Sequence, residues 1–196
     1  MKLKKQAILG IDTNSKTVKG IKRGYSTGIV YLAPSNESGI NTCKNASKGC
    51  RIACLFSAGR GSMSNVKKAR ITKTKNFFAN QTEWLGQLLE EIDKEDKKAR
   101  NNGFTFVARL NGTSDIAWET FNVFQSRQKV QFYDYTKSFS RMLQYLDKAL
   151  PSNYHLTFSK SETNGKLCSI VLQRGGNVAM VFRNYKAVVA AGFYKF

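Results

Sequence analysis

The sequence contains a single histidine, His155, and only 13 Asp and Glu among 196 residues. One histidine, with no G-x-S-x-G segment, leaves Ser-His-Asp and Cys-His catalysis without the required partners. Neither a P-loop nor a G-x-G-x-x-G segment follows any predicted strand. We therefore do not expect a hydrolytic triad, P-loop hydrolysis of nucleotides or hydride transfer.

Long apolar runs are also missing. No stretch approaches the roughly 18 apolar residues that a membrane-spanning helix needs, and the first residues lack the apolar centre of a secretory signal. Four cysteines are too few for a disulfide scaffold, and three of them lie between positions 43 and 54, which suits a reducing compartment. We expect a cytoplasmic protein without a membrane partner.

Positive charge is what the sequence has in excess. The 32 Lys and Arg residues give a formal net charge of +19, and residues 1–82 hold 16 of them against only Asp12 and Glu37. Self-repulsion of this size disfavours a compact state unless a polyanion compensates it. The charge predicts nucleic acid as the partner, and a solvated cationic surface without a partner is the alternative.

Strand-like and helical patterns alternate in the middle of the chain. The predicted strands are Phe104–Leu110, Val130–Tyr135 and Tyr154–Ser159, with helical patterns over Ile116–Phe124 and from Ser138 to Leu150 between them. This spacing is typical of β/α units, whose strands lie parallel and adjacent in one sheet. We expect an α/β fold in which residues 1–196 form a single domain.

Shorter patterns flank this core. The predicted elements before it are β-like runs at Ala7–Ile11, Thr17–Ile21 and Gly28–Ala33, a basic helix at Ser64–Asn80 and a helical pattern from Trp84 to Ile92. After it, Leu167–Gln173 and Asn177–Arg183 flank Arg174-Gly175-Gly176 and predict a β-hairpin in the 164–196 tail, with Lys186–Phe196 as a last strand. We therefore expect β-rich additions at both ends.

Polar residues follow each of the three central strands. Loops at the carboxyl ends of parallel strands converge on one edge, where ligands of such sheets bind. The predicted catalytic residues at this edge are Asp115, Asp134, Lys137, Lys160 and Glu162. Carboxylates and ammonium groups brought together can bind a charged molecule, exchange protons or hold a metal. Helix capping by Ser114, Asp115 and Ser138, with the rest as solvated loop residues, is the alternative.

Cys43, Cys50 and Cys54 form a C-x6-C-x3-C pattern. Thiolates at this spacing can close on one ion or cluster. A structural zinc site wants four ligands, and only His155 and Cys168 remain, so zinc is less favoured than an iron–sulfur cluster with one open iron. Three half-buried thiols without a metal are the alternative.

Basic residues lie next to these cysteines and on the helix that follows. The predicted phosphate contacts are Lys48, Arg51, Arg60, Lys67, Lys68, Arg70, Lys73 and Lys75. The helical ones do not share one narrow stripe, so we expect contact with the phosphate backbone and no readout of bases.

Four segments together resemble the gene product 88 domain family of phages and actinobacteria. They are Asn41–Arg60, Phe106–Ile116, Phe132–Ser138 and Tyr154–Glu162, and the resemblance covers residues 36–163. It implies a phage-type protein in the host cytoplasm. The family's cysteine motif and β/α units are similar to radical S-adenosylmethionine proteins, which implies a partial TIM-type barrel.

Through that similarity, the resemblance implies a [4Fe–4S] cluster held by the three clustered cysteines. It also implies S-adenosylmethionine beside Asn111, Gly112, Ser114 and Ser159. Three functions follow as hypotheses. The first is an accessory protein that binds nucleic acid through its basic surface. The others are a radical S-adenosylmethionine-like enzyme acting on a nucleic acid or small substrate, and a structural phage component.

Overall fold

A six-stranded sheet organises the protein, whose computed structural model describes residues 6–182. The strands are β1 (Leu9–Ile11), β2 (Tyr25–Val30), β3 (Thr105–Arg109), β4 (Gln131–Thr136), β5 (Tyr154–Ser159) and β6 (Val178–Ala179). The helices are α1 (Ser15–Ile21), α2 (Lys48–Ile52), α3 (Ser64–Ala79), α4 (Gln81–Asn101), α5 (Val123–Ser126), α6 (Phe139–Leu146) and α7 (Gly165–Gln173). Short 3-10 turns at Leu55–Ser57, Gly59–Ser62 and Trp118–Phe121 complete the described elements.

The strands lie in the sheet in their order along the chain, from β1 to β6. β2 to β6 are parallel to one another, and β1 is antiparallel to β2. The prediction of three parallel central strands is therefore confirmed, and β2 and β6 extend the parallel set on either side. The fold is mixed α/β, as expected, whereas a partial TIM-type barrel is not confirmed.

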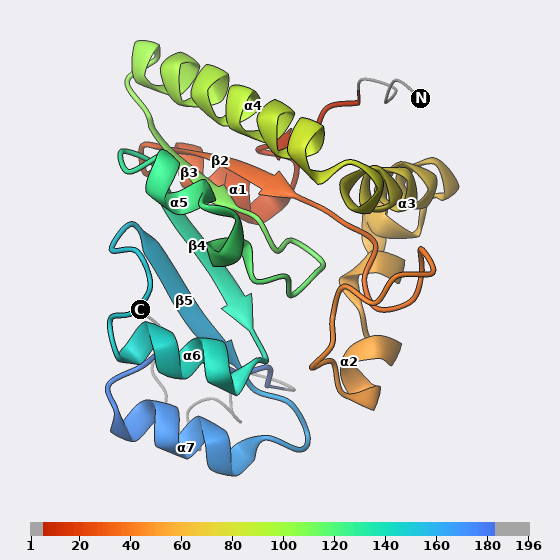
Figure 1. The fold of residues 1–196 in the computed structure, drawn as a ribbon, viewed down its shortest axis with the longest axis vertical. Coiled ribbons are helices and arrows are strands. Elements are labelled where there is room, and N and C mark those ends of the chain that lie inside the picture. Colours follow the sequence, from red (N-terminus) through yellow and green to blue (C-terminus); the bar gives the residue numbers. More distant parts are fainter. Residues whose placement is uncertain (1–5, 183–196) are drawn as a thin grey trace.

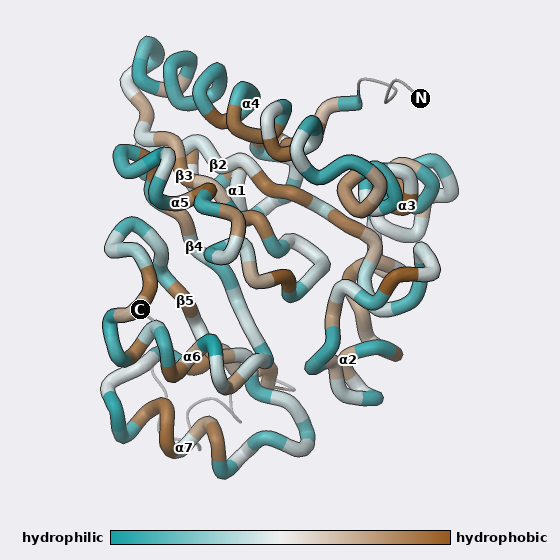
Figure 2. Tube along the Cα trace, in the orientation of Figure 1, coloured by the Kyte–Doolittle hydropathy of each residue, from teal (hydrophilic) through white to brown (hydrophobic). Residues whose placement is uncertain are grey.

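The two faces of this sheet differ in how far they are covered. One face presents the buried side chains of Phe106, Phe132, Leu156 and Phe158, which belong to the same core as residues of α4, α6 and α7. Figure 1 shows these helices on one side of the sheet, and Figure 2 shows α4 apolar toward the sheet and polar outward. We call this the helix-covered face.

The opposite face is defined here by Val107, Arg109, Tyr133, Tyr135 and Ser159, which alternate with the buried positions along β3 to β5. These side chains are half-buried or exposed in the described part of the chain. We call it the open face. Because successive residues of a strand point to opposite sides, each strand contributes apolar packing to one face and polar or aromatic groups to the other.

The two long helices form where the sequence predicts them. α3 ends at Ala79, and the Asn80 side chain then caps α4 by accepting a hydrogen bond from the backbone N–H of Glu83. Trp84, Leu88 and Ile92 recur on one face of α4 and are buried. Among the described residues, no helix combines the length and apolarity needed to cross a bilayer.

Two predicted strands are wrong, because both segments are helical. Thr17–Ile21 lies in α1, where Asn14 and Thr17 form a reciprocal capping box that outweighs the β-branched residues Thr17 and Val18. Leu167–Gln173 lies in α7, and β6 pairs in parallel with β5, so the expected hairpin is absent there. The predicted last strand, Lys186–Phe196, lies outside the described residues.

Gly176 explains why the chain turns after α7 without a hairpin. A Cβ at this position would lie 2.7 Å from Val171 and 2.9 Å from both Leu146 and Met142. The glycine therefore lets the chain pass close against α6 and α7 before β6 begins.

The helix expected over Ile116–Phe124 is shorter than predicted. The structure has a 3-10 turn and the short α5 there, separated by Asn122 in the left-handed conformation.

Candidate functional site

The three loops that follow β3, β4 and β5 meet at the carboxyl edge of the sheet. The Asp115 carboxylate accepts hydrogen bonds from Thr136 Oγ1 at 2.8 Å and from the Lys137 backbone N–H at 2.9 Å. Lys137 Nζ donates to Ser159 Oγ at 2.9 Å. The convergence expected for a parallel sheet therefore occurs, and the contacts run from the first loop through the second to the third.

The cysteine-bearing segment closes over the same edge. The Asp115 backbone N–H donates to Thr42 O at 2.9 Å. Glu162 accepts hydrogen bonds from Ser47 Oγ at 2.7 Å and from Gly49 N–H at 2.8 Å. A hydrogen bond from its own backbone N–H, followed by those from Gly49 and Ser47, lowers the pKa of Glu162. This predicted catalytic residue thus fastens the start of α2 to the loop after β5.

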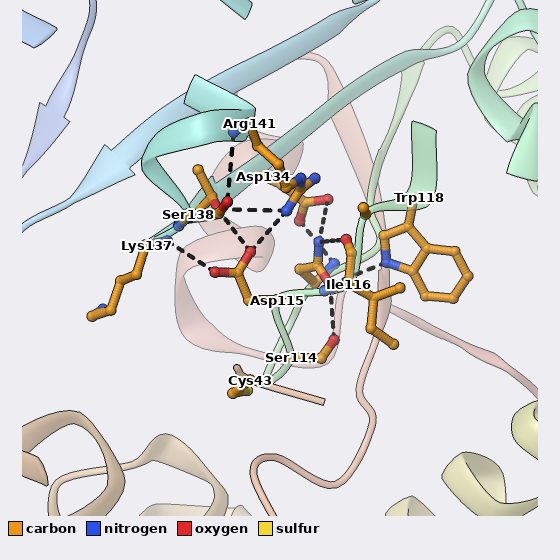
Figure 3. A network of polar contacts seen from close by, with 12 residues as sticks. Cys43, Ser114, Asp115, Ile116, Trp118, Asp134, Lys137, Ser138 and Arg141 are labelled. Atoms are coloured by element: carbon orange, nitrogen blue, oxygen red, sulfur yellow. Dashed lines mark hydrogen bonds and ion pairs between the residues drawn. The ribbon is translucent and has the colours of Figure 1, made fainter. Parts of the chain in front are cut away.

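Beneath the loops lies a polar network that the sequence did not predict (Figure 3). Arg141, on α6, pairs with Asp115 at 2.7 Å and with Glu119 at 2.6 Å, and its side chain is only 8 % exposed. It also donates to Tyr154 Oη at 2.9 Å. Because Asp115 is held by this arginine and by the second loop, its carboxylate supports the loops from inside the fold.

Asp134 is buried in the same network. Its carboxylate accepts hydrogen bonds from the Asn111 backbone N–H at 2.8 Å and from Asn111 Nδ2 at 3.3 Å. Burial raises the pKa of Asp134 to about 7, against the opposing effects of Arg109 and of the Asn111 hydrogen bond. The structure thus places this predicted catalytic residue below the loops, with a carboxyl group that titrates near neutrality.

The first loop is shaped by three of the residues predicted to contact a cofactor. Asn111 Oδ1 accepts hydrogen bonds from Ser114 Oγ, from the Ile116 backbone N–H and from Trp118 Nε1. A Cβ on Gly112 would lie 2.7 Å from Ile29 Cγ2, from the Tyr31 ring and from Val30 O. Asn111, Gly112 and Ser114 therefore hold the loop against β2 and the sheet.

Cys43, Cys50 and Cys54 line one groove and are half-buried. Cys43 Sγ lies 3.7 Å from Thr113 O beside the first loop (Figure 3). Burial, with smaller contributions from Asp115 and Cys54, raises the pKa of the Cys43 thiol, and burial also raises that of Cys54. Cys168 lies apart from them, buried in α7.

These thiols do not form a ligand set as they are placed. In residues 6–182, no group of three or more His, Cys, Asp or Glu side chains is arranged to hold a metal ion. The metal role of the three cysteines stays a prediction from the sequence, and we derive no chemical step through a cluster.

The groove has a volume of about 2570 Å³. The open face forms its floor, and parts of α1, the cysteine-bearing segment, α3 and the chain after β5 and β6 form its walls. Figure 1 shows α2 and α3 beyond the ends of β2 and β4. Lys137, Ser159, Lys160 and Glu162 also line it, so four more of the predicted site residues share this space.

The groove walls are strongly basic. They carry nine Lys and Arg side chains against three acidic ones, Glu37, Asp115 and Glu162, and Asp115 is already paired with Arg141. Five aromatic residues lie among them: Tyr25, Tyr31, Phe56, Tyr133 and Tyr135. A basic groove interspersed with aromatic rings is typical of proteins that hold single-stranded nucleic acid.

The predicted phosphate contacts separate into two groups. Lys48, Arg51, Arg60, Lys68 and Lys75 are exposed, and Lys67 is half-buried. Lys73 is enclosed: its Nζ donates to Ile8 O at 2.6 Å, and burial lowers its pKa to about 8. Arg70 is half-buried with its guanidinium 4.7 Å above the Tyr31 ring, and burial lowers its pKa. The structure therefore places Lys73 and Arg70 differently from the exposed lysines of the same helix.

Sequence reasoning missed Arg109, Tyr133 and Tyr135 on the open face and Arg141 beneath the loops. The alternation of FTFVARL and VQFYDY contained a signal for the first three, since Arg109 and the two tyrosines occupy alternate positions from Phe106, Phe132 and Asp134. No sequence pattern connects Arg141 with Asp115 and Glu119, which are 26 and 22 residues away.

The fold and this site define an α/β protein with a basic, thiol-bearing groove at the carboxyl edge of a mostly parallel sheet. The sequence matches the gene product 88 family over residues 1–195. The chain therefore belongs to the gene product 88 family, and this membership fits a phage protein. No curated protein and no solved structure matches the chain.

Proposed function

We propose that this protein binds nucleic acid in the groove, with the exposed basic residues of α2 and α3 extending the contact along the phosphate backbone. The excess of nine basic over three acidic side chains in the groove supports the proposal. Neutralising phosphates with Lys and Arg releases counterions, and this release supplies most of the affinity of sequence-independent binding. The protein would act as a phage-type accessory protein.

The size of the groove favours a polymer over a small molecule. Pockets for small ligands usually have volumes of about 300–1,000 Å³. The groove, at about 2570 Å³ in the described part of the chain, exceeds this range severalfold. An extended strand fills such a space, and its phosphates meet the basic walls on both sides of the open face.

A filter-binding titration at several salt concentrations tests the proposal. We compare the double variant Arg51→Glu/Arg60→Glu, which changes two exposed groove residues, with Lys94→Glu/Lys97→Glu on α4, which makes the same charge change outside the groove. Each lost phosphate contact lowers the slope of log affinity against log salt by about 0.9. We expect a shallower slope and at least a roughly tenfold weaker affinity for the groove variant alone. Affinity that hardly changes between low and moderate salt would contradict nucleic-acid binding.

A second candidate function has one observation in its favour: the three clustered cysteines line the same groove as the basic residues. An iron–sulfur enzyme related to radical S-adenosylmethionine proteins, acting on a nucleic acid, would use both. Anaerobic purification followed by an absorbance spectrum and an iron and zinc count tests it, with the triple variant Cys43→Ser/Cys50→Ser/Cys54→Ser as the control. A colourless protein without iron or zinc would end this candidate. A purely structural phage component, in contrast, predicts that the triple variant is silent in phage growth.

A further inference from the structure

Two arginine–tyrosine pairs lie in the groove, one on the neighbouring strands β3 and β4 and the other between α3 and the chain just after β2. The Arg109 guanidinium lies 4.8 Å from the centre of the Tyr135 ring on the open face, and that of Arg70 lies 4.7 Å from the centre of the Tyr31 ring. All four residues line the groove. At this distance the positive guanidinium is attracted to the electron-rich face of the tyrosine ring.

Both arginines have more donor groups than the described chain has acceptors for them. Three buried side-chain nitrogens of residues 6–182 have no hydrogen-bond partner: Arg70 Nη1, Arg109 Nε and Arg127 Nε. Arg127 Nε is explained, because it lies 2.6 Å from Asp93 Oδ1 in an ion pair. The other two belong to the groove. A buried donor without a partner requires an explanation, and a bound ligand or ion is one such explanation.

The charges of the two arginines are also poorly compensated. Arg109 Nε lies 3.9 Å from Asp134 Oδ1, a long contact to a carboxyl group whose pKa is raised to about 7 by burial. Arg70 has no ion-pair partner within 4.0 Å in the described residues. Positive charge beside aromatic rings in one groove suits a ligand that offers phosphates and flat π-systems together.

From these observations we propose that the groove accepts unpaired bases, which stack at the Arg109–Tyr135 and Arg70–Tyr31 pairs, so that the protein prefers single-stranded over duplex nucleic acid. This inference rests on the proposed function and specifies its substrate class. In a duplex, the faces of the bases are covered by their neighbours, whereas an unstacked strand offers them to aromatic and guanidinium planes. The side chain of Tyr135 is 39 % exposed, so its ring remains accessible.

Fluorescence anisotropy tests the inference with a labelled oligothymidine and a duplex of equal length at the same salt concentration. Tyr135→Leu removes a stacking ring, and Arg109→Lys keeps the charge while removing the planar guanidinium. Phe78→Leu, on an exposed aromatic of α3 outside the groove, is the matched control. We expect each groove variant to weaken single-strand binding by roughly five- to 150-fold, the range for loss of one base–aromatic stack, with little change for the duplex or for the control.

Each outcome separates the two proposals. Tighter binding of the single strand, lost in Tyr135→Leu and in Arg109→Lys, supports the inference. Equal binding of both nucleic acids with the usual salt dependence, unchanged in these variants, overturns the stacking inference but leaves nucleic-acid binding in place. Absence of salt-dependent binding to either probe overturns the proposed function and the inference with it. Thermal unfolding of Arg109→Lys checks that a loss of binding is not a loss of fold.

Discussion

The polar groups on the two sides of the sheet are satisfied to different degrees. Beneath the helices, Arg141, Asp115 and Asn111 are each satisfied by several hydrogen bonds or ion pairs within the chain. On the side of the groove, Arg109 and Arg70 are left with orphan donors. Polar groups that are satisfied internally hold the loops in place, whereas we assign the two arginines with unpartnered nitrogens to the proposed ligand. Whether a polar side chain has partners within the chain therefore distinguishes residues that support the fold from candidates for binding.

Removing Arg141 should produce the largest loss of stability. Arg141→Met leaves the carboxylates of Asp115 and Glu119 buried without their cation, which typically costs about 3–5 kcal/mol. Urea unfolding measures the change. Arg174→Met is the control, because its ion pair with Asp147 is exposed and such pairs contribute only about 0–1 kcal/mol. Equal effects of the two variants would contradict the distinction between the buried network and the surface.

The second-largest effect should come from apolar packing, which stabilises the helix-covered face more than the open face. Leu156 is fully buried on the helix-covered face, so Leu156→Ala should lower the free energy of unfolding by about 2–5 kcal/mol. Thr105→Ala changes an exposed residue of β3 and should stay within about 0.5 kcal/mol. The same denaturation experiment compares them, and a large effect of Thr105→Ala would show that the uncovered side is packed after all.

Glycine substitutions sharpen the comparison at the edge of the sheet. Gly112→Ala introduces a Cβ within 2.7 Å of the backbone oxygen of Val30, and such overpacking costs about 1–3 kcal/mol. Gly86→Ala in α4 meets nothing within 4 Å and should instead stabilise the protein by about 1 kcal/mol, the difference in helix propensity. Thermal unfolding of both variants tests the opposite signs, and a stabilised Gly112→Ala would refute the close approach of the loop to β2.

The ionisation of Asp134 should give the smallest change in stability, when that change is expressed per pH unit. Asp134 has a folded-state pKa raised to about 7, so the folded protein binds more protons than the unfolded chain between about pH 4 and 7. The contribution of Asp134 to stability is therefore present at low pH and is lost as the pH rises to about 7, by at most about 1.4 kcal/mol per pH unit. Urea unfolding from pH 4.5 to 7.5 should show this fall in the native protein relative to Asp134→Asn. Parallel curves for the two proteins would contradict it.

Much of the architecture could be predicted from the sequence because it depends on local patterns. The spacing of Phe104, Val130 and Tyr154 identifies parallel β/α units, and Ser138 caps α6 as predicted. The convergence of the loops after these strands follows from the parallel arrangement alone. Asn14, followed three residues later by Thr17, is a local capping signal for a helix, and it outweighs the strand preference of the β-branched residues Thr17 and Val18.

What could not be predicted depends on contacts between distant segments. Nothing in the sequence says that Asp115 and Asp134 point beneath the loops, because that depends on Arg141 and on the burial of β4. The position of Arg70 above Tyr31 depends on how α3 packs against the end of β2. The residues predicted to be catalytic lie near one edge of the sheet, and their catalytic role stays a prediction because it depends on which side of the sheet each side chain faces.

Ultraviolet crosslinking of the native protein to a thymine-rich single strand, followed by mass spectrometry of the crosslinked peptides, tests the central claim most directly. We predict that the crosslinks map to peptides containing Tyr31, Tyr133 or Tyr135, and that excess unlabelled single strand removes them. Crosslinks confined to α4, α6 and α7, or no crosslinks at a salt concentration where the strand binds, would contradict the assignment of the groove.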